Sequence, residues 1–169
     1  MKVLLLFTGG TISMVRDPKT GALHPADMTT FQSFVPELFA GEIQVDMVPF
    51  DPLLDSSDLN PDNWRQMAQV VQQHYDAYDG FVILHGTDTM AYTASAVTFM
   101  LPNIDRPVVF TGSQLPLADM LSDGPDNLRT AFAMAASGNP GVFLAFDRKV
   151  MLGCRAVKVR ASGFSAFES

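Results

Sequence analysis

The sequence predicts an α/β protein: a doubly wound, open and mostly parallel β-sheet with helices on both faces. Short apolar runs recur along the chain, helical patterns fill most of the gaps between them, and polar clusters follow four of the runs. Alternating strands and helices are typical of βαβ units, which pair their strands in parallel. We therefore expect a single sheet that helices cover above and below.

The expected strands are the short apolar runs. A strand that is apolar on both faces is typical of a parallel sheet buried between two layers of helices. The five expected strands are residues 3–7, 43–48, 81–84, 108–110 and 142–146.

Four segments between these strands carry helical patterns. Around Trp64 and Val71, apolar residues three and four positions apart form one stripe that a helix can bury. Asn60 is the expected N-cap of that helix and Pro61 its first residue. The four expected helices are residues 28–39, 61–75, 88–101 and 126–136.

Two other segments are expected to lie at the surface. Residues 17–21 are polar and rich in turn-forming residues, so residues 13–25 are predicted to form a mobile loop that can act as a lid. The last stretch, residues 149–169, carries Phe164 and Phe167 close to its end. Both rings are expected to be exposed, and a second subunit is the expected cover.

Composition limits the possible functions. The 169 residues, 47% of them hydrophobic, suit one compact domain, and the net charge of −7 argues against nucleic acid or an anionic membrane as partner. The single Cys154 excludes an internal disulfide and fits a reducing compartment. Residues 3–7 are too short an apolar run for a signal peptide or a membrane span, so a cytoplasmic protein is expected.

The most informative motif is Thr-Gly-Gly-Thr-Ile at residues 8–12, directly after the first expected strand. It places the Thr11 hydroxyl, next to flexible glycines, at the end of a strand where open α/β sheets bind ligands. Met14 stands where a dinucleotide-binding loop has its third glycine, which disfavours a nucleotide. The motif alone leaves two readings open: Thr11 is a nucleophile, or it caps a helix at a tight turn.

A second motif, His-Gly-Thr-Asp-Thr-Met, occupies residues 85–90 after the third expected strand. Thr87 and Asp88 add a hydroxyl and a carboxylate to the same edge of the sheet. The alternative is structural, because Thr87 can cap the following helix and Asp88 can interact with the helix dipole. His85 is expected to be a packed or hydrogen-bonded residue and not a base.

Two further polar segments follow strands: Asp-Ser-Ser-Asp at residues 55–58 and Thr-Gly-Ser-Gln at residues 111–114. Each by itself is an ordinary solvated loop. Four such clusters at the same edge of a parallel sheet predict a pocket suited to a small zwitterion.

These motifs, in this order, resemble those of the bacterial-type L-asparaginases, nearest to their cytoplasmic type I branch. The segments at residues 79–84 and 90–96 strengthen the similarity to type I. The resemblance runs from end to end and corresponds to the family's larger N-terminal domain, which has a flavodoxin-like fold. It implies a short variant in which residues 1–169 form a single catalytic domain without the family's C-terminal domain.

The resemblance implies hydrolysis of L-asparagine to L-aspartate and ammonia through a threonine acyl-enzyme. Thr11 matches the nucleophile, which needs a neighbour to accept its proton. Thr87, Asp88 and Lys158 match the supporting triad, in which a lysine whose positive charge is disfavoured by burial can accept a proton through Thr87. Backbone N–H groups near Thr11 or Thr87 would stabilise the oxyanion.

The resemblance also implies the substrate-binding residues. Ser56 and Asp88 match the residues that hold the α-carboxylate and α-ammonium groups, and Ser57 stands where the periplasmic type carries glutamine. Gly10 and Ser113 match residues around the scissile amide, and Thr87 contributes to binding as well. No metal or organic cofactor is implied, and a homo-oligomer, dimer or tetramer, is expected.

Two departures from the family pattern matter. A loop tyrosine that assists the nucleophile has no counterpart, because Ala22 stands near its position and only His24 offers a ring nearby. The C-terminal domain, which helps to complete the site of a neighbouring subunit, is the second missing feature. Both favour an alternative function, a non-catalytic amino-acid-binding domain. A further alternative is an amidase that supplies ammonia to a partner.

Overall fold

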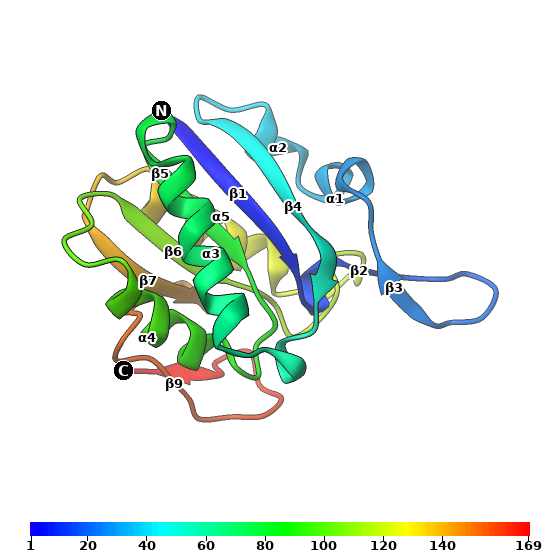
Figure 1. The fold of residues 1–169 in the computed structure, drawn as a ribbon. Helices are drawn as coiled ribbons and strands as arrows, with labels where there is room; N and C mark the ends of the chain where they lie inside the picture. The colour runs from blue at the N-terminus through cyan, green and yellow to red at the C-terminus, as the bar shows by residue number, and fades with distance from the viewer.

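The computed structural model describes every residue from Met1 to Ser169 and confirms the predicted α/β architecture (Figure 1). A six-stranded sheet has the order β4-β1-β5-β6-β7-β8. The first five strands are parallel, and only β8 runs antiparallel to its neighbour. Numbered along the chain, the five parallel strands have the order 2-1-3-4-5, which is that of flavodoxin-like folds.

The five expected strands are the five parallel strands of this sheet. The sixth, β8, and two small two-stranded sheets were not predicted. The large sheet consists of β1 (Lys2–Gly9), β4 (Gln44–Leu54), β5 (Gly80–Leu84), β6 (Pro107–Thr111), β7 (Gly141–Phe146) and β8 (Lys149–Leu152), and the small sheets pair β2 (Met14–Arg16) with β3 (Leu23–Pro25) and β9 (Val157–Lys158) with β10 (Phe167–Glu168).

The helices also lie close to their expected positions. The segment predicted as one helix from residue 28 to 39 is two helices, because Pro36 lacks the N–H that a continuous helix needs and instead begins the second one. Asn60 caps its helix as predicted, with its side chain accepting from the Asp62 backbone N–H. The helices are α1 (Met28–Phe34), α2 (Pro36–Phe39), α3 (Pro61–Gln73), α4 (Met90–Met100) and α5 (Gly124–Ala135), with 3-10 turns η1 (Thr11–Ser13), η2 (Ser56–Asp58) and η3 (Tyr75–Ala77).

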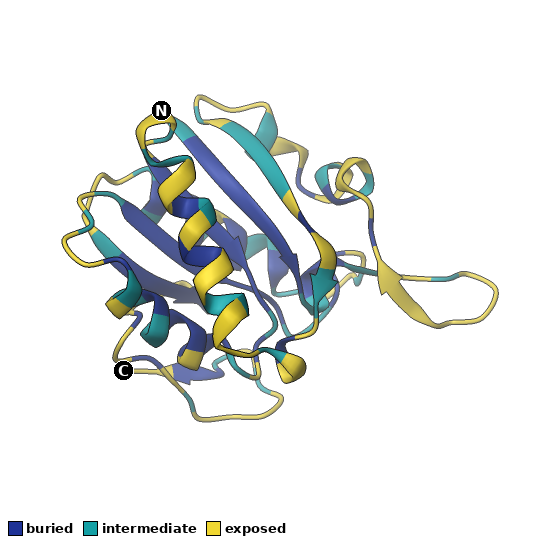
Figure 2. Ribbon diagram, viewed as in Figure 1, coloured by how far each residue is buried: buried dark blue, intermediate teal, exposed yellow.

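The sheet separates two hydrophobic cores. In β1, Leu4 and Leu6 face the core that α3 and α4 cover, while Val3 and Leu5 face the core that α1 and α5 cover. Figure 1 shows α3 and α4 in front of the sheet, and Figure 2 shows the central strands buried along their length. None of the helices combines the length and the apolar character that crossing a membrane requires.

Two surface segments differ from expectation. Residues 13–25 contain a hairpin, β2–β3, in which Met14 pairs with Pro25, and Figure 1 shows it projecting from the body of the domain. The expectation that both terminal phenylalanines are exposed is wrong for Phe167. Its ring lies 4.9 Å from that of Phe146 and is only 2% exposed, because β10 folds back onto the domain's own core, whereas Phe164 is 47% exposed.

Candidate active site

The four polar clusters meet at one edge of the sheet, as the sequence predicted. They follow β4, β1, β5 and β6, which are adjacent in the sheet and parallel, so their carboxyl ends lie side by side. A cavity of about 260 Å³ opens there between the first three of these loops. Its walls include Gly10, Thr11, Ser56, Thr87 and Asp88.

Two glycines bring these loops together. A Cβ atom on Gly10 would lie 2.7 Å from the backbone nitrogen of Gly86, and one on Gly86 would lie 2.3 Å from the Ser56 hydroxyl oxygen. Gly10 also has φ = 90°, a conformation that other residues rarely adopt. The loops after β1, β4 and β5 can therefore touch only because both positions lack a side chain.

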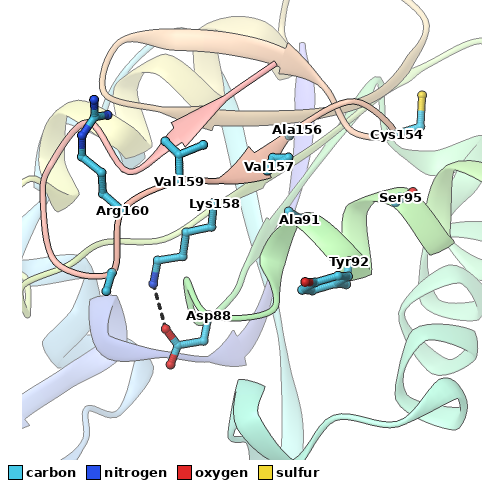
Figure 3. A pocket seen from close by; sticks show the side chains of 11 residues that line it. Asp88, Ala91, Tyr92, Ser95, Cys154, Ala156, Val157, Lys158, Val159 and Arg160 are labelled. Carbon is cyan, nitrogen blue, oxygen red and sulfur yellow. Dashed lines mark hydrogen bonds and ion pairs between the residues drawn. The ribbon is translucent and has the colours of Figure 1, made fainter.

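Thr87, Asp88 and Lys158 form one hydrogen-bonded group. The Lys158 ammonium lies 2.9 Å from the Thr87 hydroxyl oxygen and 2.7 Å from a carboxylate oxygen of Asp88. Figure 3 shows Lys158 extending from β9 toward Asp88, which lies just before α4. The Lys158 side chain is 13% exposed and that of Asp88 73%, so only the lysine is mostly enclosed by protein. The structure thus brings these three side chains together.

The last residues of the chain fix the position of Lys158. In the small sheet, Lys158 pairs with Phe167, whose ring packs against Phe146 of β7. The lysine and Asp88 also border a second hollow of about 460 Å³ between α4 and the segment of residues 154–161 (Figure 3). Neither this antiparallel pairing nor the burial of Phe167 was predicted from the sequence.

Thr87 is not a helix cap in this structure. The helix begins later, with Thr89 as its N-cap, and the Thr87 hydroxyl donates to Gln114 over 3.2 Å. Thr11 likewise caps nothing, since the short 3-10 turn begins at Thr11 itself after Gly10. The structural alternatives considered for both threonines therefore do not account for their positions.

Two expected substrate-binding residues lie outside the walls of the cavity. Ser57 is exposed, and its hydroxyl donates to Asp55 over 2.8 Å. The Ser57 backbone N–H and hydroxyl together lower the pKa of Asp55. Ser113 is buried, and its hydroxyl donates to the carbonyl of Leu115. Both hydroxyls already have partners within their own loops.

Gln114 is a site residue that the sequence did not reveal. Its side chain contacts Thr87 and also donates to the carbonyl oxygen of Gly163 over 3.0 Å. These partners lie 27 and 49 residues away in the sequence. The only signal was its place in one of the four polar segments.

The two histidines near the site, His85 and His24, each have a ring nitrogen near a backbone carbonyl oxygen. His85 is 1% exposed, and its ring Nδ1 lies 2.7 Å from the carbonyl oxygen of Gly86, so Nδ1 carries the proton. Burial lowers the pKa of His85 to about 4, which leaves the ring neutral at pH 7. His24 is exposed on the hairpin, with its ring near the Pro25 carbonyl. No group of three or more His, Cys, Asp or Glu side chains is arranged to hold a metal ion.

The fold and the cavity define a flavodoxin-like α/β domain whose site combines two threonines, a lysine and an aspartate at the carboxyl ends of parallel strands. The chain belongs to the asparaginase family. The family model described as "Asparaginase, N-terminal" matches residues 2–169. Within the family, the chain stands with the type I L-asparaginases.

Individual relatives support this membership. L-asparaginase 1 of Escherichia coli K12 is 44% identical over 169 residues, covering 99% of this chain and 50% of the relative. The thermostable L-asparaginase from Thermococcus kodakarensis has a TM-score of 0.92 at 40% identity, covering 100% of this chain and 51% of that one. A probable cytoplasmic L-asparaginase from Campylobacter jejuni has a TM-score of 0.83 at 28% identity, covering 99% and 51%. The chain thus spans about half the length of these relatives.

Proposed function

We propose that residues 1–169 form a catalytic domain that hydrolyses L-asparagine to L-aspartate and ammonia. The observation that carries this proposal is the joint position of Thr11 and Thr87 on one cavity, with Lys158 bonded to Thr87 at 2.9 Å. A hydroxyl nucleophile needs a group that accepts its proton, and this arrangement supplies one beside the cavity. The similarity to full-length L-asparaginases supports the same substrate.

The reaction proceeds through an ester of Thr11. The Thr11 oxygen forms a bond to the side-chain amide carbon of asparagine, while its proton passes to the Thr87 oxygen and the Thr87 proton passes to the uncharged amine form of Lys158. The carbon–nitrogen bond then breaks, the nitrogen takes up the proton that the relay returns from Lys158 through Thr87, and ammonia leaves. A water molecule hydrolyses the ester, which releases aspartate and restores the Thr11 hydroxyl. Backbone N–H donors around the cavity stabilise the oxyanion, each typically by about 3 kcal/mol.

The remaining walls of the cavity bind the amino-acid end of the substrate. Ser56 and Asp88 lie on the same cavity as Thr11, so a hydroxyl and a carboxylate are available for the α-carboxylate and α-ammonium groups. A carboxylate paired with one ammonium group can also attract a second, which suits Asp88 to an α-ammonium. The proposed enzyme uses no cofactor and assembles as a homo-oligomer. It acts in the cytoplasm, which is the location given for its Campylobacter jejuni relative.

A second candidate is a non-catalytic domain that binds amino acids. Ala22 stands near the position of the family's loop tyrosine, and the β2–β3 hairpin that carries it projects away from the body of the domain (Figure 1). The same cavity would then bind asparagine without turnover.

Ammonia release distinguishes the two candidates. Wild-type protein is incubated with L-asparagine, L-glutamine and D-asparagine, and Thr11→Ala is assayed beside it. Thr130→Ala is the matched control, because that hydroxyl bonds within α5, away from the cavity. Ammonia from L-asparagine that is lost in Thr11→Ala alone supports the enzyme. Calorimetric binding of L-asparagine without ammonia release supports the binding domain, and an active Thr11→Ala contradicts the proposed mechanism.

A further inference from the structure

One hydrogen bond joins the turn after β4 to the beginning of α4. The Thr89 hydroxyl donates to the backbone carbonyl oxygen of Ser56 over 2.7 Å, across 33 positions in the sequence. Ser56 lies in the 3-10 turn η2, and Thr89 is the residue directly before α4. Since Asp88 precedes Thr89, the bond connects the two residues that the proposed function assigns to the amino-acid end of the substrate, Ser56 and Asp88.

Thr89 is not used as a helix cap, although it stands at the N-cap position. Threonine is favoured there because its hydroxyl oxygen can accept a hydrogen bond from a backbone N–H of the first helical turn. In α4 the Thr89 side chain accepts no such bond, whereas Asp27 and Asn60 cap α1 and α3 with their side chains. The Thr89 hydroxyl is instead directed to Ser56, so its role is to link two segments and not to begin a helix.

The two ends of this bond differ in how firmly the fold holds them. On the side of α4, Met90 and Ala94 are fully buried in the core that α3 and α4 cover. On the other side, the residues of η2 are exposed except for Ser56, which is 8% exposed. The other hydrogen bonds of this turn are local and end on Asp55, the residue before it. Thr89 is therefore fixed by the core, and its hydroxyl tethers the backbone of an exposed turn.

The position of Ser56 matters because the residue lines the cavity, together with Gly86 and Asp88. A Cβ atom on Gly86 would lie 2.3 Å from the Ser56 hydroxyl oxygen, so this turn already approaches the loop after β5 as closely as it can. Gly86 limits how near the turn can come, and the bond from Thr89 limits how far it can move away. Together they set the spacing between the Ser56 hydroxyl and the Asp88 carboxylate.

We propose that Thr89 is a positioning residue that holds Ser56 at a fixed distance from Asp88 and thereby selects substrates that carry an α-carboxylate beside an α-ammonium group. The inference deepens the proposed function and rests on it. Without the tether, Asp88 keeps its place before α4 while η2 is free to shift. Binding of the α-carboxylate then weakens, and binding of the α-ammonium is retained. Thr11 and Lys158 are not part of this link, so the chemical steps are unaffected.

Thr89→Val tests the proposal, because valine has the shape of threonine without its hydroxyl. KM for L-asparagine should rise about 3- to 10-fold, the usual worth of one hydrogen bond, while kcat stays within about twofold. Thr89→Ser keeps the hydroxyl and should have the wild-type KM. Thr98→Val is the matched control and should keep wild-type kinetics, because the Thr98 hydroxyl also donates to a backbone carbonyl oxygen over 2.7 Å, but within α4. Thermal unfolding of each variant separates these effects from a loss of folded protein.

Two substrate analogues add a signature that a general loss of structure would not produce. Succinamic acid is L-asparagine without its amino group, and 3-aminopropanamide is L-asparagine without its α-carboxylate. Both are measured as competitive inhibitors of L-asparagine hydrolysis. In Thr89→Val, the inhibition constant of succinamic acid should rise by the same factor as KM, about 3- to 10-fold, while that of 3-aminopropanamide should stay within about twofold. Equal weakening of both analogues would show a general distortion of the cavity and would overturn the inference.

The outcomes separate this inference from the proposed function. If wild type releases ammonia from L-asparagine and Thr89→Val keeps the wild-type KM, the inference fails and the function stands. If wild type binds L-asparagine without releasing ammonia, the proposed hydrolysis fails. Calorimetric dissociation constants of the same compounds then take the place of KM and the inhibition constants, with the same expectations. If wild type does not bind L-asparagine at all, the inference fails together with the proposed function.

Discussion

The Lys158 ammonium donates a hydrogen bond of 2.9 Å to the Thr87 hydroxyl oxygen, although the two residues lie 71 positions apart in the sequence. One comes from a two-residue strand near the end of the chain, the other from the loop after β5. The pair depends on the fold and not on local sequence. In this pair the lysine can have either of two roles: it can supply a fixed positive charge, or it can exchange a proton with Thr87.

Substitutions of Lys158 should distinguish these roles. Lys158→Met removes both, and ammonia release should fall about 10²- to 10⁴-fold, the usual contribution of a positioned acid or base. Lys158→Arg keeps the positive charge beside Asp88 but cannot release a proton, so it should be nearly as inactive. Lys149→Met, a control on the exposed side of β8, should retain activity. An active Lys158→Arg would show that charge alone is enough.

Gly86 should tolerate no side chain while Ser56 is present. In Gly86→Ala the new Cβ would lie 2.3 Å from the Ser56 hydroxyl oxygen and 2.6 Å from its Cβ. The loops must move apart, which should destabilise the protein by about 1 to 3 kcal/mol in urea unfolding. Adding Ser56→Gly should recover most of this loss, because it removes both clashing atoms. Gly41→Ala, whose Cβ would meet only a backbone oxygen at 3.4 Å, is the control and should change stability little.

The parallel sheet could be predicted from the sequence because the signals for each strand lie in consecutive residues. Each parallel strand contains an apolar run, and the segments after β1, β4, β5 and β6 carry the candidate residues Thr11, Ser56, Thr87 and Ser113. Parallel strands place their carboxyl ends at one edge, so convergence of Thr11, Ser56 and Thr87 follows from topology alone. The helix that begins at residue 61 was predicted for the same reason, because its N-cap and its apolar stripe lie within one short segment of the sequence.

The parts that the sequence did not reveal depend on contacts between distant segments. The pairing of β9 with β10 joins two-residue strands, which are too short to carry a period of alternation. Burial of Phe167 rather than Phe164 depends on which ring meets Phe146, and the sequence around them does not separate the two. Ser113 was expected near the substrate, yet its hydroxyl bonds within its own loop, because a loop conformation decides where a short side chain points.

The buried ring of Phe167 should support activity as well as stability. Phe167→Ala removes a side chain that is 2% exposed and packs on Phe146, so unfolding should become easier by about 3 to 5 kcal/mol. Because Phe167 pairs with Lys158, ammonia release should fall even where the variant remains folded. Phe164→Ala is the matched control, since that ring is 47% exposed and should contribute little to stability. Equal effects of the two substitutions would contradict this account of the chain end.

His85 should make the protein sensitive to mild acid. Burial lowers its pKa to about 4 in the folded state, against 6.5 for an ordinary histidine, so between these values the unfolded chain binds more protons. Folding stability is then fully present above pH 6.5 and is lost as the pH falls toward 4. The loss should amount to about 2 to 3 kcal/mol between pH 7.5 and pH 4.5.

The measurement is urea unfolding of wild type, His85→Gln and His24→Gln at several pH values between 4.5 and 7.5. His85→Gln should show a flatter dependence on pH than wild type, whatever its stability at pH 7.5, because its side chain does not titrate. His24→Gln, on the exposed hairpin, should keep the wild-type slope. Hydrogen bonds lower the pKa values of Asp27 and Asp126 from 3.8, so their contributions are lost only at lower pH, outside this window. Parallel curves for wild type and His85→Gln would show that another group causes the acid sensitivity.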